Sequence, residues 1–371
     1  MTRPLPPAPR PAGGHGRPRD LPSGGAVPPG PGPSPARASA PVTTLAAERA
    51  ADPSAAVRTP GEQAASRAAG AARESVGLVG AGRAGSAVAL ALASVGHPVV
   101  AVVTRSEVAR ARAAGRFPAA RIGSLERVAD GLRAADLLLV AVPDDAIAPT
   151  VQRLAALGAL RAGQALAHLS GRHGLRALTA GVEPGAARIA MHPIMTLPGD
   201  RDDPGVFAGV PFGVTADPGA AALARRLVTG IGGTLVEVAD DRRELYHAAV
   251  VLGGNFLASL TLAAREALAA AGLPEPAVAL GPLLRASLDN ALAGGWPAAT
   301  GPIRRADVGT VLAHRRALAE VDPALAEVYR ALASFTTDEL ARANLLGEAA
   351  AGRLRTALEN RPSPGPSSPG P

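Results

Sequence analysis

The feature that most restricts the fold of this chain is a turn of three glycines between two apolar runs. The turn reads Gly80-Ala81-Gly82-Arg83-Ala84-Gly85. It directly follows the short apolar run Val76–Val79, and the helical pattern Ser86–Val95 begins where it ends. A chain with 43 glycines can show such a spacing by chance, so the conclusion depends on the strand before the turn and the helix after it. A strand, a glycine turn and a helix in this order open a dinucleotide-binding unit.

Each glycine of the turn has a physical task in such a unit. The first allows the tight turn, the second lets the backbone approach a pyrophosphate, and the third lets helix and strand pack closely. The helix N-terminus adds unpaired N–H groups and the positive end of a dipole. We therefore predict that a cofactor binds the turn at Gly80, Gly82, Arg83, Ala84 and Gly85. The alternative is a glycine-rich turn that holds no ligand.

Strand-like and helical runs alternate through the first part of the chain. The predicted strands are Val76–Gly80, Pro98–Val103, Asp136–Val142, Gln164–Leu169, Arg188–Met191, Pro211–Thr215 and Thr234–Val238. Helical patterns separate them, at Gly82–Val95, Glu107–Ala114, Leu125–Ala134, Ala146–Leu157, Leu175–Ala180 and Gly219–Ile231. The alternation predicts an α/β Rossmann domain over residues 74–238, doubly wound on a mostly parallel sheet. Its dinucleotide-binding core is expected at residues 74–190.

After residue 238 the strand signals stop. The helical patterns are Asp241–Ala271, Glu275–Ala293, Ile303–Ala319 and Pro323–Leu346. Residues 239–346 are therefore predicted to form an all-α C-terminal domain that binds substrate and dimerises. The segment Leu245–Ala264 has no charged residue, and it is long enough to span a bilayer. Because it contains several polar residues and follows an α/β domain, we interpret it as a buried central helix and expect no membrane partner.

The two ends of the chain differ in composition from the middle. Residues 1–73 are rich in Pro, Gly, Ala and Arg and hold nine arginines against four acids, which leaves +5 of the net charge of +7. A segment of this kind cannot bury enough surface to fold, so residues 1–73 are predicted to be a disordered tail. Residues 347–371, which end in a Pro- and Ser-rich stretch, are predicted to be a second one.

Composition also excludes several classes of partner. Charge outside the first tail is nearly balanced and aromatic residues make up only 2% of the chain, so we expect no nucleic-acid partner. There is no Cys, and the histidines lack HxxxH or HExxH spacing, so no metal site is expected. The missing Cys and the lack of a signal-peptide pattern favour a cytoplasmic location.

The end of the second predicted strand bears on the cofactor type. NAD-binding proteins usually place Asp or Glu there, on the ribose 2′-hydroxyl. This chain has Thr104, Arg105 and Ser106 and no acid. Arg105 can pair with a 2′-phosphate, and the two hydroxyls can hydrogen-bond to it, so NADP is predicted over NAD. The alternatives are a solvated Arg105 in an Arg-rich chain, and FAD or another nucleotide on the turn.

The segment Val142-Pro143-Asp144-Asp145 follows a strand predicted to lie at the centre of the sheet. Ligands of open α/β sheets lie across the carboxyl ends of the strands. The backbone of Val142 and Pro143 is therefore expected to border the nicotinamide ribose. One of the two aspartates is expected to cap the helix that follows.

Several short segments together resemble one family. They are Val142-Pro143-Asp144-Asp145, His168-Leu169-Ser170-Gly171, Met191-His192-Pro193, Tyr246-His247-Ala248-Ala249 with Asn255, and Thr300-Gly301-Pro302-Ile303-Arg304 with Asp307. Over about residues 74–345 the chain resembles a bacterial family that joins a Rossmann-like oxidoreductase domain to domain of unknown function 2520. The resemblance implies a fold of the 6-phosphogluconate dehydrogenase-like group, near pyrroline-5-carboxylate and ketopantoate reductases. It also implies nicotinamide dependence and a helical dimerisation domain, but no substrate.

The chain departs from that family at one loop. Family members usually read Arg-Gly-Asp where this chain has Arg305-Ala306-Asp307. A Cβ at position 306 excludes any backbone conformation that only glycine adopts, which puts the role of this loop in doubt.

Histidines are the best candidates for proton transfer, because the hydride chemistry belongs to the cofactor. Ser170 and His192 follow strands that end at the predicted cofactor edge, so both are expected to bind substrate. A similar His-Pro pair lines the active site of prephenate dehydrogenases. His247 is the strongest catalytic candidate, and Asn255 lies a little over two helical turns later, so both can face one cleft. The alternative is that His247 packs inside a buried helix.

The turn Thr300–Arg304 is the candidate site for a substrate carboxylate. Its unpaired N–H groups, the Thr300 hydroxyl and Arg304 could together bind an anion. It loosely resembles the Gly-Gly-Thr-Thr turn of pyrroline-5-carboxylate reductases. An Arg304–Asp307 pair that closes the turn is an equal alternative.

The sequence thus predicts an NADP-dependent oxidoreductase for a small carbonyl, imine or alcohol that carries a carboxylate. A non-catalytic NADP-binding redox sensor is the main alternative, and a prephenate-type dehydrogenase a weaker one. A homodimer is expected, because the apolar helices of the second domain exceed what one small bundle can cover.

Overall fold

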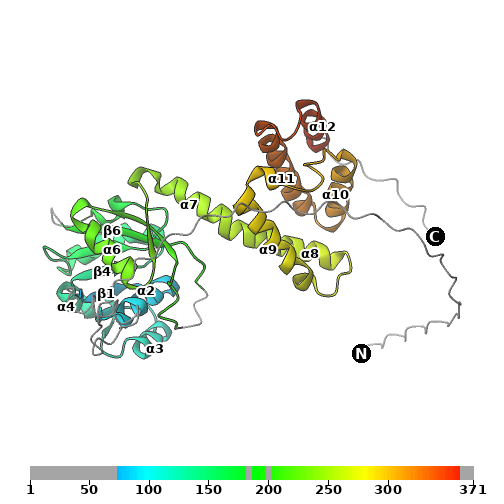
Figure 1. Ribbon diagram of the computed structural model, residues 1–371. Coiled ribbons are helices and arrows are strands. Elements are labelled where there is room, and N and C mark those ends of the chain that lie inside the picture. The colour runs from blue at the N-terminus through cyan, green and yellow to red at the C-terminus, as the bar shows by residue number, and fades with distance from the viewer. Residues whose placement is uncertain (1–72, 181–185, 198–201, 360–371) are drawn as a thin grey trace, which may run out of the picture. The chain divides into compact units, whose positions relative to one another are not determined.

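The computed structural model describes residues 73–180, 186–197 and 202–359 (Figure 1). The predicted disordered tail at the N-terminus lies outside the described residues except for Arg73. Residues 73–238 are called the sheet domain below, and residues 239–359 the helical region.

The sheet domain is built on eight strands in the order β3-β2-β1-β4-β5-β6-β7-β8. Their bounds are β1 Val76–Val79, β2 Val99–Val103, β3 Arg121–Gly123, β4 Leu137–Val140, β5 Ala165–His168, β6 Ala187–Pro193, β7 Pro211–Ala216 and β8 Thr234–Glu237. All neighbouring pairs are parallel except β6 and β7. The predicted doubly wound, mostly parallel sheet is therefore confirmed.

One strand escaped the sequence prediction. β3 has only three residues, lies at the edge of the sheet and exposes Arg121. A strand this short shows no measurable alternation of apolar and polar residues, so nothing distinguishes it from a loop.

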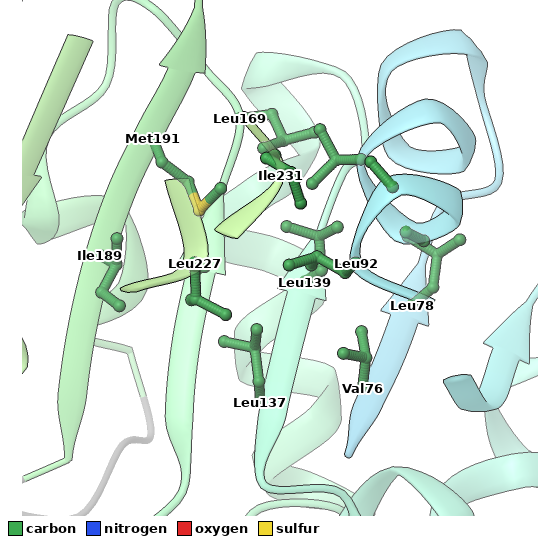
Figure 2. Close-up of a cluster of buried hydrophobic side chains, with 14 of the residues drawn as sticks. Val76, Leu78, Leu92, Leu137, Leu139, Leu169, Ile189, Met191, Leu227 and Ile231 are labelled. Carbon is green, nitrogen blue, oxygen red and sulfur yellow. The ribbon is translucent and has the colours of Figure 1, made fainter. Parts of the chain in front are cut away.

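Helices cover both faces of this sheet. Those of the sheet domain are α2 Arg83–Ser94, α3 Glu107–Arg116, α4 Leu125–Ala134, α5 Ile147–Ala156 and α6 Ala221–Gly230. Side chains of β4 alternate between two buried clusters: Leu137 and Leu139 belong to one, Leu138 and Val140 to the other. Figure 2 shows the first cluster, where Leu92 of α2 lies among side chains of the central strands. A strand buried on both faces is what its continuous apolar run predicts.

The helical region contains no strand among its described residues. Its helices are α7 Arg243–Val251, α8 Leu257–Ala270, α9 Pro276–Gly294, α10 Val308–Val321, α11 Pro323–Arg342 and α12 Glu348–Glu359. A π-helical turn, Leu252–Phe256, joins α7 to α8. The predicted all-α C-terminal domain is confirmed, and its core forms between α10, α11 and α12.

The prediction of a disordered tail from residue 347 is wrong for residues 348–359. These residues form α12, which buries Ala351, Leu354 and Leu358 in the helical core. The three positions share one helix face, because they are spaced by three and four residues. The main-chain carbonyl of Ala357 also accepts a hydrogen bond from Arg315, at 2.6 Å. Residues 360–371 lie outside the described part.

The prediction of a buried central helix is also wrong for the single chain. The continuous helix Asp240–Ala270 has a mean hydropathy of 1.5 over its most apolar window, none of which is buried. Leu252 and Phe256 are 63% and 57% exposed. Among the described residues this is the one helix long and apolar enough to cross a membrane, which by itself is weak support for a membrane span. The described residues of the chain therefore leave this helix uncovered.

Candidate active site

The strand register brings four predicted segments to one edge of the sheet. Val79 pairs with Val140, Val140 with His168, and His168 with Ala190. Because these strands are parallel, the residues that follow them leave the sheet on the same side. The glycine turn, the loop after β4, the loop after β5 and the end of β6 are therefore neighbours along that edge.

The glycines of the turn have the backbone geometry predicted for them. Gly80 adopts φ +100°, and a Cβ there would lie 2.6 Å from the carbonyl oxygen of Ala141. A Cβ at Gly85 would lie 2.4 Å from the oxygen of Gly80. A Cβ at Gly82 would meet nothing within 4 Å, so this part of the turn is open. The first glycine thus forms the tight turn, the second leaves the approach to the backbone open, and the third allows helix and strand to pack closely.

The N-terminus of α2 fits a phosphate group. Gly82 is the N-cap of the helix and no side chain caps its free N–H groups. Arg83, the first residue of α2, is exposed, and its guanidinium forms no hydrogen bond or ion pair with another described residue. Ala84 is partly buried and leaves the approach free of a long side chain. An anion placed here would meet backbone donors, the helix dipole and one available guanidinium.

The end of β2 is compatible with a 2′-phosphate. Thr104 is 6% exposed, and its hydroxyl has no hydrogen-bond partner in the described structure. Arg105 is exposed and makes no hydrogen bond or ion pair to a described residue. Ser106 is the N-cap of α3 and accepts from the N–H of Ala109 at 3.2 Å, which leaves its own proton free to donate. The set therefore offers a cation and two hydroxyl donors, and no carboxylate.

The loop after β4 is arranged differently from the prediction. Pro143 is exposed and precedes a single 3₁₀ turn, Asp144–Ala146, that leads into α5. Neither aspartate caps a helix N-terminus with its side chain, so the predicted cap is wrong. Asp145 lies 3.6 Å from Arg172 of the next loop instead. Val142 is partly buried against the core, and the predicted contact of the Val142–Pro143 backbone with the nicotinamide ribose stays a prediction.

Two of the predicted histidines meet at this edge. His192 at the end of β6 and His247 of α7 have ring centroids 5.5 Å apart, with planes at 87°. Between them runs the loop after β5, where a Cβ at Gly171 would lie 2.3 Å from His247 and 3.1 Å from His192. Only a residue without a side chain lets both imidazoles approach this loop.

Ser170, predicted to bind substrate, is used inside the protein. Its side chain is 7% exposed and accepts from the N–H of His173 at 3.0 Å. Its N–H donates to Nδ1 of His168, and its carbonyl accepts from Arg243 at 2.7 Å. Ser170 therefore fixes the loop that carries Gly171, and its hydroxyl is buried rather than exposed at the cofactor edge.

Arg243 is the most buried cation among the described residues next to these histidines. It is 1% exposed and donates to Ser170 and, at 3.0 Å, to the hydroxyl of Thr215. Within the described part of the chain no carboxylate forms an ion pair with it. Burial lowers the pKa of the Arg243 guanidinium. A buried positive charge with no direct ion pair among the described residues favours negative charge in whatever binds beside it.

The charge state of the histidines follows from this environment. Burial is the largest cause that lowers the pKa of His192 to about 4, and the charges of His247 and Arg243 act in the same direction. Burial likewise lowers the pKa of His168 to about 4. Both rings are therefore neutral at pH 7. His168 has both ring nitrogens engaged, with Gly174 and Ser170, and is a structural residue of the loop.

The remaining predicted residues are not brought to this cluster by any contact in the described structure. Asn255 lies in the exposed π-helical turn, whose wider spacing changes the angle between it and His247. Thr300 is exposed, and Arg304 donates to the carbonyl of Leu345 at 2.6 Å. The alternative pairing of Arg304 with Asp307 is wrong too, because Asp307 caps α10 through Thr310. Arg304 thus links two segments of the helical region through its hydrogen bond to Leu345.

Sequence reasoning missed Tyr246 as a site residue. Its hydroxyl lies 2.9 Å from Nδ1 of His192, and it stands next to His247 in the chain. The chain has only two tyrosines, and one of them beside the leading catalytic candidate was a usable signal. Its partner lies 54 positions away, which no local pattern indicates.

A cavity of about 570 Å³ opens beside the cluster. Its lining is mostly charged and includes Asp144, Asp145, Arg172, His173, Arg176, Asp240, Asp241 and Glu244. The described residues contain no group of three or more His, Asp or Glu side chains arranged to hold a metal.

Comparison with known proteins agrees with this architecture. Residues 58–193 match the Rossmann-like domain family, and residues 210–336 match domain of unknown function DUF2520. The chain therefore carries a Rossmann-like domain followed by a DUF2520 domain. The resemblance found in its strand-end and helix segments is confirmed. No curated protein matches the chain.

Solved structures share the fold. A putative NADP oxidoreductase from Bacteroides fragilis is 24% identical with a TM-score of 0.60, over 71% of this chain and 97% of its own. A protein from Thermotoga maritima is 21% identical with a TM-score of 0.53, over 72% of this chain and 99% of its own. At these identities the likeness shows the fold alone. The chain is structurally similar to NAD(P)-dependent oxidoreductases, and its substrate is not identified.

Proposed function

We propose that the chain is an NADP-dependent oxidoreductase that acts on a small carbonyl, imine or alcohol. One observation carries the proposal: the glycine turn and the His192–His247 cluster lie along the same carboxyl edge of one sheet. In open α/β sheets ligands bind at that edge, where the strand order reverses between β1 and β4. The name of the Bacteroides fragilis protein supports the same class.

The preference for NADP is supported by the end of β2. Thr104 and Ser106 offer hydroxyls and Arg105 a free guanidinium, whereas a carboxylate for the 2′-hydroxyl of NAD is missing. Gly82 and the uncapped start of α2 would hold the pyrophosphate.

The protein's part of the reaction follows from the histidines. A bound nicotinamide supplies or accepts the hydride. His247 is partly exposed at the cluster and moves a proton to or from the substrate atom. His192 is neutral and therefore hydrogen-bonds rather than ionises. The buried charge of Arg243 stabilises negative charge that develops on a substrate oxygen.

The predicted carboxylate on the substrate loses its support. It depended on Thr300 and Arg304, and Arg304 is engaged with Leu345. The proposal therefore names only the reacting group of the substrate. A catalytic role for Asn255 stays a prediction from the sequence.

We further propose that the chain forms a homodimer through the helical region. Large exposed apolar side chains gather on α7 to α11 and include Leu245, Leu252, Phe256, Leu257, Leu260, Leu262, Leu283, Leu292 and Phe335. Apolar surface on this scale marks an association site. Leu252, Phe256 and Leu260 recur every four residues, so they form one stripe that a second copy can cover.

Light scattering on the full chain tests the dimer. The wild type is expected at twice the chain mass, and Phe256→Glu with Leu260→Glu at the chain mass. Val108→Glu is the matched control, because Val108 is 67% exposed in the sheet domain. A monomeric wild type would overturn this proposal, as would wild-type protein that sediments with phospholipid vesicles.

The absence of Cys supports a cytoplasmic location, which cell fractionation tests.

Fluorescence titration with NADPH and NADH tests the cofactor. NADPH should bind more tightly, and Arg105→Ala should weaken NADPH without affecting NADH. Arg112→Ala, at an exposed arginine of α3, is the control and should change neither affinity. Binding of NADH alone would refute the assignment to Arg105, and no nucleotide binding at all would falsify the proposed function.

A substrate screen with NADPH oxidation as readout tests catalysis. His247→Ala should abolish turnover and leave NADPH affinity unchanged, whereas His314→Ala, at an exposed histidine of α10, should change neither. A redox sensor would bind NADPH and turn over nothing in the screen. Turnover of prephenate would favour the prephenate-type alternative.

A further inference from the structure

Tyr246 and His192 form a contact that the proposed reaction does not yet use. The phenol oxygen lies 2.9 Å from Nδ1 of His192, and the rings meet edge to face with centroids 5.8 Å apart. One residue comes from α7 and the other from the end of β6. The contact occupies one ring nitrogen of His192 and leaves Nε2 for another partner.

The backbone of β7 makes room for this phenol. Gly213 stands opposite His192 in the antiparallel register of β6 and β7. A Cβ at Gly213 would lie 2.2 Å from the Tyr246 oxygen, so the phenol occupies the space that any side chain there would take.

The donor in the Tyr246–His192 bond follows from these contacts. Burial raises the pKa of Tyr246, so the phenol keeps its proton at neutral pH. Among the described residues its one hydrogen-bond partner is Nδ1 of His192, so a phenol proton turned away from that nitrogen would have no protein acceptor. Nδ1 of His192 is therefore the acceptor.

The ring of His192 carries one proton at pH 7. Burial lowers its pKa to about 4; His247, Arg243 and His168 act in the same direction, and only Asp144 opposes them. With Nδ1 accepting, the proton of the neutral ring is on Nε2.

We propose that Tyr246 is a positioning residue whose phenol fixes His192 with its proton on Nε2, so that the imidazole donates a hydrogen bond to the substrate atom that is reduced or oxidised. The proposal rests on the function proposed above, because it assigns His192 a substrate atom. It divides the work between the histidines. His192 polarises the substrate atom as a neutral donor, and His247 transfers the proton.

The chain offers a matched control. Tyr329, the other tyrosine, also contacts a histidine: its oxygen lies 3.1 Å from Nδ1 of His314, with ring centroids 5.7 Å apart. Tyr329→Phe therefore removes the same kind of hydrogen bond in the helical region.

Nitrogen NMR of the histidine rings in the ¹⁵N-labelled full chain tests the proposal. In the wild type, His192 should show an unprotonated Nδ1 and a protonated Nε2, with His192→Gln used to assign its signals. Tyr246→Phe should give a mixture of both tautomers at His192, and Tyr329→Phe should leave His192 as in the wild type. A proton on Nδ1 in the wild type would overturn the proposal, as would an unchanged tautomer in Tyr246→Phe.

A second variant covers the case in which Tyr246→Phe does not fold. Gly213→Ala keeps the tyrosine and displaces its oxygen, so the same mixture of tautomers is expected, and an unchanged tautomer would again overturn the proposal. NADPH titration of the same samples separates the two proposals. A wild type that binds no nucleotide refutes the oxidoreductase, while the tautomer result decides the role of Tyr246.

Discussion

The molecule contains the same residue pair in two settings. His192 and Tyr246 meet at the carboxyl edge of the sheet, and His314 and Tyr329 meet between α10 and α11. Both pairs are edge to face with a hydrogen bond through Nδ1. At the sheet edge, two glycines in other segments leave space for the side chains of α7, and the guanidinium of the buried Arg243 lies 5.7 Å from the centre of the Tyr246 ring. In the helical region the histidine is exposed.

The difference shows what turns a common contact into a candidate site. A hydrogen bond between two side chains of a helical bundle links neighbouring helices and no more. At the sheet edge, the missing side chains of Gly171 and Gly213 leave the space that His247 and Tyr246 occupy. Groups held in this way are positioned with little freedom, which is what a reacting group requires.

The largest expected effect comes from filling the space at Gly171. In Gly171→Ala, the added Cβ would lie 2.3 Å from His247, so the imidazole must move. We expect turnover to fall by about 100-fold, because a displacement of about 1 Å has effects of this size. NADPH affinity should not change. Gly230→Ala, where a Cβ meets nothing within 4 Å, is the control, and equal turnover in both variants would contradict the comparison.

The next effect concerns stability at acid pH. His168 and His192 have folded-state pKa values of about 4, against 6.5 for an unperturbed His. The unfolded chain therefore takes up protons first as the pH falls, and folding loses stability between about pH 6.5 and 4. Each histidine should cost about 2 kcal/mol between pH 7 and 5. Urea unfolding of His168→Gln at both pH values should show a smaller loss than the wild type; an equal loss would refute the buried, neutral ring.

A smaller effect is expected from the charge of Arg243. That charge contributes to the lowered pKa of His192, after burial and His247. Arg243→Met should therefore raise the NMR titration midpoint of His192, by up to about one pH unit. Arg243→Lys keeps the charge and should leave the midpoint near that of the wild type. If both variants shift the midpoint alike, lost hydrogen bonds rather than charge set the pKa.

The smallest effect lies in the helical region. Ala306 adopts φ +55°, a left-handed conformation that costs a residue with a Cβ about 1 kcal/mol. Ala306→Gly should therefore raise the free energy of unfolding by about 0.5–1 kcal/mol. Asn344→Gly, at φ +57°, should gain less, because Asn tolerates this conformation. Loss of stability in Ala306→Gly would show that packing of the methyl group outweighs the strain.

Much of the fold could be predicted because its signals are local. The glycine turn, the doubly apolar β4 and the alternation of elements each occupy a few neighbouring residues. Ala306 was not predicted: its Cβ was taken to exclude a backbone suited to glycine, yet the residue adopts the left-handed conformation that glycine favours. β3 was missed because three residues are too few to show an alternation of apolar and polar side chains. α12 was missed because the Pro-rich end after it dominated the composition.

The site could be predicted only in part, because its contacts join distant segments. His192 and His247 were found by chemistry and by strand position. Arg304 has the chemistry of an anion ligand, yet a carbonyl 41 positions away takes its guanidinium. Arg243 and Tyr246 act through β6, β7 and the loop after β5, and no spacing within α7 shows that these segments surround it.

The edges of the sheet have a consequence for behaviour at high concentration. The sheet ends in β3 on one side and β8 on the other, strands of three and four residues. Strands this short offer few free N–H and C=O groups on which a further strand could add, so they protect against aggregation through the sheet. The exposed apolar helices are then the surface through which we propose that the chain associates. We expect overexpressed chain to form discrete particles of defined size rather than fibrils that bind amyloid dyes.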